Sequence, residues 1–307
     1  MMKIKKNCPV IRSIKNFSEP LFNSFSQIML QENALTGFLF LAGLYVGHWY
    51  FGLAALLAVV SGVLTAVLLR FPKAEIKAGL YGFSAALTGV ALLVLFEARP
   101  FLWLLVIIGG VLSSLLQRLF IVLKIPAFTF PFIVVSWFLV FFIRNFTDIM
   151  PSSAVAGMSE NGLLDWLLTS TNGFGQVIFQ GSALQGTMFF VAVFFNNPVA
   201  ALFGLAASSL GAAISLGLGQ ELNVVQTGLF GFNAVLTAIV FSGQTRKNVA
   251  QAFVGVILTI VLHHLFLQCN FFERVGGVFT FPFVVATWLM LWMIHLAGRI
   301  GKIKSLK

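Results

Sequence analysis

Apolar positions dominate this chain in long runs, and the runs are separated by short polar, glycine-rich or proline-containing breaks. The runs cover approximately 36–52, 54–70, 82–98, 101–118, 131–147, 185–200, 201–218, 231–243, 249–267 and 281–297. A helix needs about 20 apolar residues to cross the hydrocarbon core of a bilayer, so several of these runs are short. We therefore expect ten membrane-spanning helices with boundaries that are uncertain by a few residues.

Composition supports a membrane protein. Of the 307 residues, 59% are hydrophobic and 9% are charged, and the mean hydropathy is +0.98. Soluble domains carry about 25% charged residues, so the excess apolar surface must face lipid. The chain is predicted to be an all-α polytopic protein of the cell (inner) membrane.

The chain contains an internal duplication. Three phrases occur twice in the same order: Gln27 with Gln176, 79–88 with 228–237, and 128–132 with 279–283. The first two pairs are 149 residues apart and the third is 151 residues apart. Collinear repeats of this length indicate two related halves.

An odd number of spans in each half predicts that the halves enter the membrane from opposite sides. Basic residues mark cytoplasmic ends, and they fit this arrangement. The cytoplasmic set would be Arg70, Lys73, Lys77, Arg118, Lys124, Arg246, Lys247 and both terminal clusters, and the outer set Arg99, Arg144 and Arg274. We expect both termini in the cytoplasm.

These features give an expected division of the chain. It comprises a basic cytoplasmic tail (1–24) with a break at Pro20, a first repeat (25–147), an extracytoplasmic connector (148–172), an inverted second repeat (173–297) and a basic tail (298–307). Apolar segments too short to cross lie around 73–81, 122–129, 222–230 and 270–280. Interrupted segments at matching places in inverted halves predict paired half-length re-entrant helices and a transport site between them.

Ionisable residues are placed unfavourably for coupled transport or catalysis. The nine acids all lie outside the middle of the clear spans. Proton- and sodium-coupled carriers usually need such a group at the midplane, so passive movement of a neutral solute is predicted. No catalytic or metal-ligand constellation is visible, and Cys8 and Cys269 are too few for a zinc site. We predict no enzyme activity, no cofactor, no metal and no nucleic-acid partner; the basic clusters flank spans and face membrane lipid.

Duplicated residues at the breaks are the candidate pore residues. Thr129 and Thr280 each precede Phe-Pro, where a helix starts afresh, so each hydroxyl either faces a cavity or caps the following helix. Phe83 and Phe232 follow glycines, and Leu87 and Leu236 lie one helical turn further on the same face. Gln27 and Gln176 begin short segments, where capping is the alternative role. His263 and His264 share one span, where a structural role is favoured over a proton or ammonium relay.

The duplicated Gly-Leu-(Tyr/Phe)-Gly-Phe-(Ser/Asn) phrase, the duplicated Thr-Phe-Pro-Phe phrase and Gly-Phe-Gly-Gln-Val at 173–177 carry a resemblance. Over about residues 24–297, the chain resembles the bacterial and animal urea transporter family. The resemblance implies a ten-span inverted repeat with two pairs of half-length helices, assembled as a homotrimer with one pore in each protomer. It also implies passive, channel-like permeation of urea.

The resemblance assigns a role to each duplicated pair. Phe83 and Leu87, with Phe232 and Leu236, would line a narrow slot, Thr129 and Thr280 would offer hydroxyls at its middle, and Gln27 and Gln176 would lie near its mouths. Leu30 and Phe179 stand where the family often has a wall residue, so the aromatic wall is expected to be complete on only one side. Ser84 stands where the family usually has asparagine, which Asn233 retains, and no pore-side acid matches, because Glu75 and Glu221 fall at different offsets.

Two other functions remain open at this point. The chain could conduct another small neutral or weakly basic solute, such as ammonia, water or a short amide. It could also be a membrane enzyme or receptor, although no acid–base constellation supports that alternative.

Overall fold

The computed structural model describes residues 9–152 and 163–304, and this part of the chain is helical apart from turns and one isolated bridge. The helices of the first half are α1 (Pro9–Ser26), the 3-10 helix η1 (Gln27–Met29), α2 (Ala34–Gly47), α3 (Trp49–Leu68), α4 (Lys73–Lys77), α5 (Phe83–Leu95), α6 (Pro100–Val122) and α7 (Phe130–Phe146). Those of the second half are α8 (Leu163–Gln176), α9 (Ala183–Asn196), α10 (Pro198–Gly217), α11 (Leu222–Gln226), α12 (Phe232–Phe241), α13 (Arg246–Leu267), α14 (Asn270–Arg274) and α15 (Phe281–Lys304).

Five of these helices are long and apolar enough to cross a membrane: α3, α6, α10, α13 and α15. Five more, α2, α5, α7, α9 and α12, are apolar but have only 10–17 residues. Each run expected from the sequence falls mainly on one helix of these two groups, and the runs 36–52 and 185–200 also include the first residues of the next helix. An all-helical multi-pass membrane protein is therefore confirmed.

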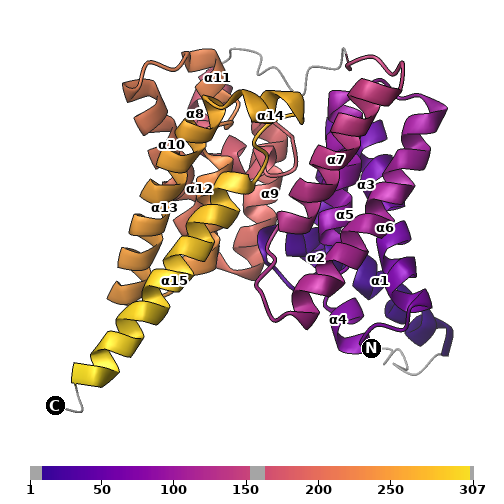
Figure 1. Ribbon diagram of the computed structural model, residues 1–307, viewed down its shortest axis with the longest axis horizontal. Coiled ribbons are helices and arrows are strands. Elements are labelled where there is room, and N and C mark those ends of the chain that lie inside the picture. Colours follow the sequence, from indigo (N-terminus) through magenta and orange to yellow (C-terminus); the bar gives the residue numbers. More distant parts are fainter. Residues whose placement is uncertain (1–8, 153–162, 305–307) are drawn as a thin grey trace, which may run out of the picture.

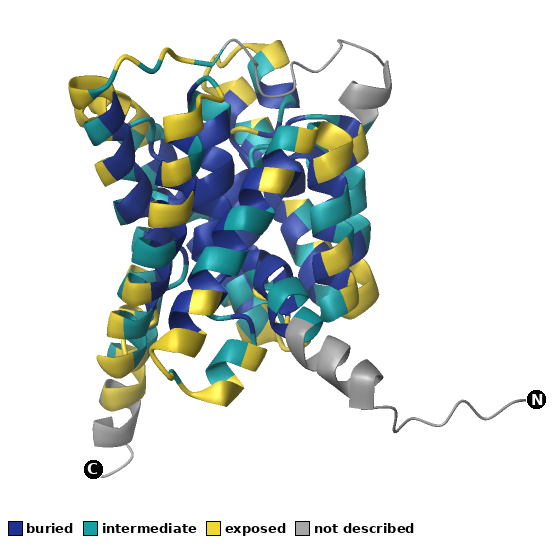
Figure 2. Ribbon diagram, turned by 90° about the vertical axis from the view of Figure 1, so that its right-hand side faces the viewer, coloured by how far each residue is buried: buried dark blue, intermediate teal, exposed yellow. Residues whose placement is uncertain are grey.

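The two halves lie side by side, with α2 and α9 between them (Figure 1). The short helix α4 of the first half lies at the lower end of Figure 1, whereas α11 and α14 of the second half lie at the upper end. Buried positions fill the middle of the molecule, and exposed positions concentrate on its outer faces and ends (Figure 2). Many exposed positions on the outer faces are apolar, including Leu64, Phe138 and Phe253, which is typical of helices that contact lipid.

The break expected at Pro20 is wrong, because α1 runs through this proline to Ser26. The last residues of α1 are core: Ser24 and Phe25 are fully buried, and α1 contacts α2, α3 and α5. Polar side chains that suggested a tail donate hydrogen bonds inside the protein. Asn23 Nδ2 donates to Lys77 O at 2.9 Å, and Ser24 Oγ donates to Pro20 O at 2.7 Å.

The expected connector and C-terminal tail both contain helical residues. Residues 163–172, assigned to the connector, belong to α8, and Asn172 at its buried end donates to Gln226 O at 2.7 Å. The last helix, α15, continues past the expected boundary at 297 to Lys304. Of the short segments, 73–81, 222–230 and 270–280 each contain a five-residue helix, whereas 122–129 is a turn.

Backbone conformations repeat between the halves. Leu30 and Phe179 have φ of 58° and 59°, and Phe128 and Phe279 have φ of 47° and 46°. A left-handed conformation is rare for bulky residues, so its occurrence at matched positions has a structural cause in both halves. Gly79 and Gly228, with φ of 80° and 83°, form a third matched pair.

Contacts between the halves are reciprocal. Trp137 Nε1 donates to Gly277 O at 2.9 Å, and its counterpart Trp288 Nε1 donates to Pro126 O at 2.8 Å. Five of the aromatic contacts across the boundary between the halves follow the same relation. Four form two exchanged pairs, Phe128–Phe283 with Phe132–Phe279 and Phe130–Trp288 with Trp137–Phe281, and the fifth, Phe40–Phe189, joins matched residues. Exchanged contacts of this kind are the property of a two-fold axis.

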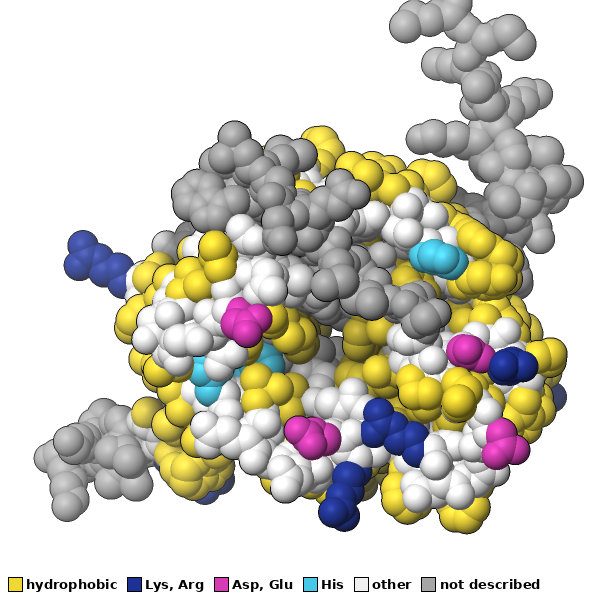
Figure 3. Space-filling view, turned by 90° about the horizontal axis from the view of Figure 1, so that it is seen from above, with side chains coloured by type: hydrophobic (Ala, Val, Ile, Leu, Met, Phe, Trp, Pro, Cys, Tyr) yellow, Lys and Arg dark blue, Asp and Glu magenta, His cyan; other side chains and the backbone are white. Residues whose placement is uncertain are grey.

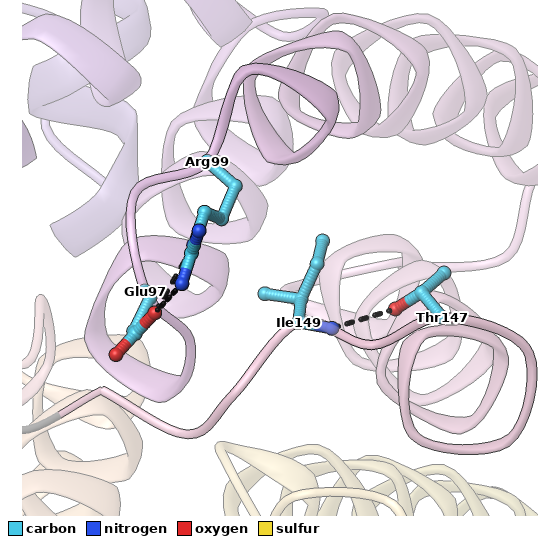
Figure 4. Close-up of polar contacts among 4 residues, drawn as sticks. All are labelled: Glu97, Arg99, Thr147 and Ile149. Atoms are coloured by element: carbon cyan, nitrogen blue, oxygen red, sulfur yellow. Dashed lines mark hydrogen bonds and ion pairs between the residues drawn. The ribbon is translucent and has the colours of Figure 1, made fainter.

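At the upper end, the loop after α5 lies beside the chain after α7 (Figure 4). Arg99 forms an ion pair with Glu97 at 2.9 Å, and Ile149 N donates to Thr147 Oγ1 at 3.4 Å. Backbone bonds from Glu97 N to Met150 O and from Ser152 N to Leu95 O hold the two segments together. The segments that follow α5 and α7 are therefore joined by backbone hydrogen bonds at the upper end of the molecule.

Candidate functional site

The two duplicated threonines meet at the boundary between the halves. Thr129 precedes α7 and Thr280 precedes α15, and their Oγ1 atoms are 2.6 Å apart. Both side chains are buried, with exposures of 3% and 2%. Thr129 makes no capping hydrogen bond to α7, so its hydroxyl does not act as a helix cap. Each hydroxyl can accept as well as donate, so the pair still offers a free lone pair.

Asn233 at the start of α12 fixes the break before α15. Its Nδ2 donates to Phe279 O at 3.2 Å, and its Oδ1 accepts from Phe283 N at 3.2 Å. These bonds satisfy backbone groups that the helix start leaves open. The first half has Ser84 at the matched position, and the Ser84 hydroxyl is buried with no hydrogen-bond partner. Only the second break is therefore held by a side-chain amide.

This difference predicts unequal effects of mutation. Asn233→Ala leaves a buried carbonyl and a buried N–H without a partner, and we expect it to reduce the free energy of unfolding by about 1–3 kcal/mol. Ser84→Ala at the matched position removes a hydroxyl that bonds to nothing, so its effect should stay within about 0.5 kcal/mol. Unfolding midpoints of the two variants in detergent provide the measurement. Equal losses of stability would show that the Asn233 hydrogen bonds do not stabilise the break before α15.

The predicted slot residues lie at the starts of α5 and α12. Phe83 and Phe232 are 5% and 7% exposed, whereas Leu87 and Leu236 are completely enclosed. Both helices are held against their neighbours by hydroxyl pairs, namely Thr88 with Ser113 at 3.1 Å and Thr237 with Thr259 at 2.7 Å. The two helices consequently have little freedom to shift the aromatic rings.

A cavity of about 540 Å³ lies above the threonine pair, on the side of α11 and α14. Figure 3 views this end of the molecule, which is hollowed near its centre. The lining residues are Leu95, Phe132, Gln176, Val177, Phe179, Asn223, Val224, Thr227, Leu229, Phe232, His263, Leu267, Gly276, Gly277, Val278, Phe279 and Thr280. The cavity is thus mostly apolar, with amides, hydroxyls and one imidazole as its polar groups.

Four predicted residues, Gln176, Phe179, Phe232 and Thr280, line this cavity together. The other six, Gln27, Leu30, Phe83, Leu87, Thr129 and Leu236, are not part of its wall. Gln27 is on the first-half side, where its Nε2 donates to Ala78 O at 3.0 Å, and Leu30 is 37% exposed. The cavity therefore contains second-half residues almost exclusively.

Phe179 belongs to an aromatic cluster that the sequence did not identify. Its ring lies edge-on to Phe132 at 6.1 Å and to Phe279 at 6.0 Å. Phe132 and Phe279 are members of the duplicated Phe-Thr-Phe-Pro-Phe phrase, which is the signal that could have indicated them. Leu30 stands at the matched position in the first half, so the aromatic lining is asymmetric.

No charged side chain lines the cavity, and a half-buried ion pair lies near the lower end of the molecule. Arg118 pairs with Glu75 at 3.0 Å, and Tyr81 donates to Glu75. Burial, and after it the hydrogen bond to the Glu75 carboxylate, raise the pKa of the Tyr81 phenol to about 12. Tyr81 therefore stays protonated at neutral pH. Within residues 9–152 and 163–304, no three His, Cys, Asp or Glu side chains are placed to hold a metal ion.

Comparisons with known proteins give a consistent result. The family model described as Urea transporter matches residues 19–295. Urea transporter 1 of Rattus norvegicus is 29% identical over 289 residues, which cover 89% of this chain and 71% of the relative. Urea transporter 1 of Mus musculus is 27% identical over 291 residues, with the same coverage. Urea transporter 1 of Ovis aries is 27% identical over 303 residues, which cover 90% of this chain and 76% of the relative.

Proposed function

The chain belongs to the urea transporter family, and from this premise we propose that it is a passive channel through which urea permeates a narrow slot between the two halves. The slot would have the apolar faces of Phe83, Leu87, Phe232 and Leu236, and hydrogen-bond acceptors along its edges. The observation that carries the proposal is the buried threonine pair, 2.6 Å apart, below a mostly apolar cavity.

The chemistry of urea fits such a slot. Urea is planar, uncharged and rich in N–H donors, so flat apolar walls admit it and acceptors replace the water that it sheds. Without acceptors, each lost hydrogen bond would cost on the order of several kcal/mol. Hydrated ions would meet apolar walls without a compensating charge, which disfavours their passage.

We also propose that ten helices span the membrane as two inverted repeats, with re-entrant half-length segments, and that both termini are cytoplasmic. Reciprocal bonds of Trp137 and Trp288 support a two-fold relation, and α4 and α11, which occupy matched places in the sequence, lie at opposite ends. Basic residues support the orientation. Assembly as a homotrimer is proposed from the family resemblance alone.

Urea flux into proteoliposomes tests the proposal. We expect urea to equilibrate faster than in empty liposomes, and the final internal concentration to equal the external one with or without an imposed proton gradient. No carboxylate lines the cavity, so the acid that proton-coupled carriers usually place on the solute path is missing from its wall. Accumulation of urea above the external concentration when the gradient is present would disprove passive transport.

The same liposomes distinguish urea from other neutral solutes. Ammonia, water and short amides should each be measured beside urea under the same osmotic conditions. A protein-dependent permeability to one of them that exceeds the permeability to urea would replace urea as the principal solute.

A further inference from the structure

His263 has an unusual position for a histidine in an apolar helix. It lies in α13, is 1% exposed and yet contributes to the wall of the cavity beside Phe232. Its ring meets the Phe232 ring edge-to-face, with 5.5 Å between centroids and 80° between planes. The imidazole is therefore in direct contact with an expected wall of the slot.

The hydrogen-bonding capacity of this imidazole is unused within the described protein. Nδ1 of His263 is completely enclosed and has no partner, whereas Nε2 is not enclosed in this way. An enclosed N–H without an acceptor is rarer and more unfavourable than an enclosed lone pair, so the proton belongs on Nε2. The residue then presents one N–H donor at the cavity side.

The first half has a polar group at the corresponding place. Helices α6 and α13 match with an offset of 146 residues, which aligns Ser113 with Thr259 and Gln117 with His263. Gln117 is 5% exposed, and its Oε1 also has no hydrogen-bond partner. Each half therefore buries a polar side chain with an unpartnered atom, one helical turn after Ser113 or Thr259. A buried polar group without a partner needs an explanation other than packing, and its occurrence in both halves indicates a shared function.

We propose that His263 is a further specificity-determining residue, which donates a hydrogen bond from Nε2 to the carbonyl oxygen of a urea-like solute in the cavity. This inference rests on the proposed function. Threonine hydroxyls and backbone carbonyls serve the N–H groups of urea, but its carbonyl oxygen needs a donor. The cavity wall offers few donors, among them His263 and the amides of Gln176 and Asn223.

The test compares urea with thiourea, whose sulfur accepts hydrogen bonds weakly. In His263→Leu proteoliposomes we expect urea permeability to fall about threefold to tenfold, and thiourea permeability to change by less than about twofold. His263→Gln restores an N–H donor of the kind present in the first half, and it should retain most of the urea permeability. His264→Leu is the matched control, because His264 bonds to Ser215 Oγ at 3.3 Å and is not part of the cavity wall.

The outcomes separate the inference from the function on which it rests. Absence of urea flux in the unaltered protein would overturn the proposed function itself. Normal flux in the unaltered protein with an unchanged urea-to-thiourea ratio in His263→Leu would overturn only the role of His263. An equal loss for both solutes would show that His263 merely supports the Phe232 ring. If the leucine variant does not fold, His263→Met provides the same comparison with a flexible apolar side chain.

Discussion

The Gly228→Ala protein is expected to lose about 2–5 kcal/mol of folding free energy. Gly228 has φ of 83°, a left-handed conformation that L-residues rarely adopt, and an added Cβ would lie 2.3 Å from the carbonyl carbon of Asn172. Because the obstacle is backbone at the buried end of α8, it cannot rotate away. The strained φ accounts for about 1–2 kcal/mol and the overlap for about 1–3 kcal/mol more.

Gly219→Ala separates these two contributions. Gly219 has the same φ of 83°, but an added Cβ would meet nothing within 4 Å. This variant should therefore lose only the conformational part, about 1–2 kcal/mol. Thermal unfolding of both variants in the same detergent provides the measurement, and equal midpoints would show that the close approach of α8 to Gly228 is unimportant.

Removal of the threonine hydroxyls should have the largest effect on flux. Thr129→Val or Thr280→Val keeps the side-chain volume but deletes one acceptor at the middle of the proposed path. Loss of one hydrogen bond there raises the barrier by about 0.5–1.5 kcal/mol, which lowers urea flux a few-fold to roughly tenfold. The double variant has no hydroxyl at this place. Because the two hydroxyls contact each other, its loss of flux should differ from the product of the two single losses.

Thr287→Val is the control for this series. Thr287 lies within α15, the helix that begins directly after Thr280. Its side chain is completely buried, and its hydroxyl has no hydrogen-bond partner. The same substitution there removes a buried hydroxyl without touching the cavity wall. Urea flux of Thr287→Val should match the unaltered protein. Normal flux in folded Thr129→Val and Thr280→Val proteins would show that neither hydroxyl contacts the solute.

Hydropathy and duplication predict much of this fold because both signals are local or periodic. The apolar runs locate the long helices, and matched glycines and Phe-Pro pairs locate the breaks. The hydropathy pattern does not predict helices α1 and α8, because their polar residues suggest a solvated segment. The Nδ2 groups of Asn23 and Asn172 each donate to a carbonyl 54 residues away, and no local pattern reveals such a partner.

The candidate site shows a similar division. Thr129 and Thr280 could be selected because they stand at the same place in a duplicated phrase, and the structure brings them into contact. Their contact with urea stays a prediction. His263 was not selected, because its counterpart Gln117 is 146 residues away, whereas the obvious repeats are 149 and 151 residues apart. A small shift between the halves in the preceding loops was enough to hide the match.

The reciprocal bonds between the halves have a consequence for biosynthesis. The ribosome completes residues 126–137 well before residues 277–288. During this interval the indole N–H of Trp137 and the hydroxyl of Thr129 lack their hydrogen-bond partners, Gly277 O and Thr280 Oγ1. In a bilayer these groups have no water with which to bond. A nascent first half is therefore an unfinished structure that must be protected until its counterpart arrives. A chain that ends before residue 277 would lack the partners of both groups, so the first half alone would keep buried polar groups unpaired.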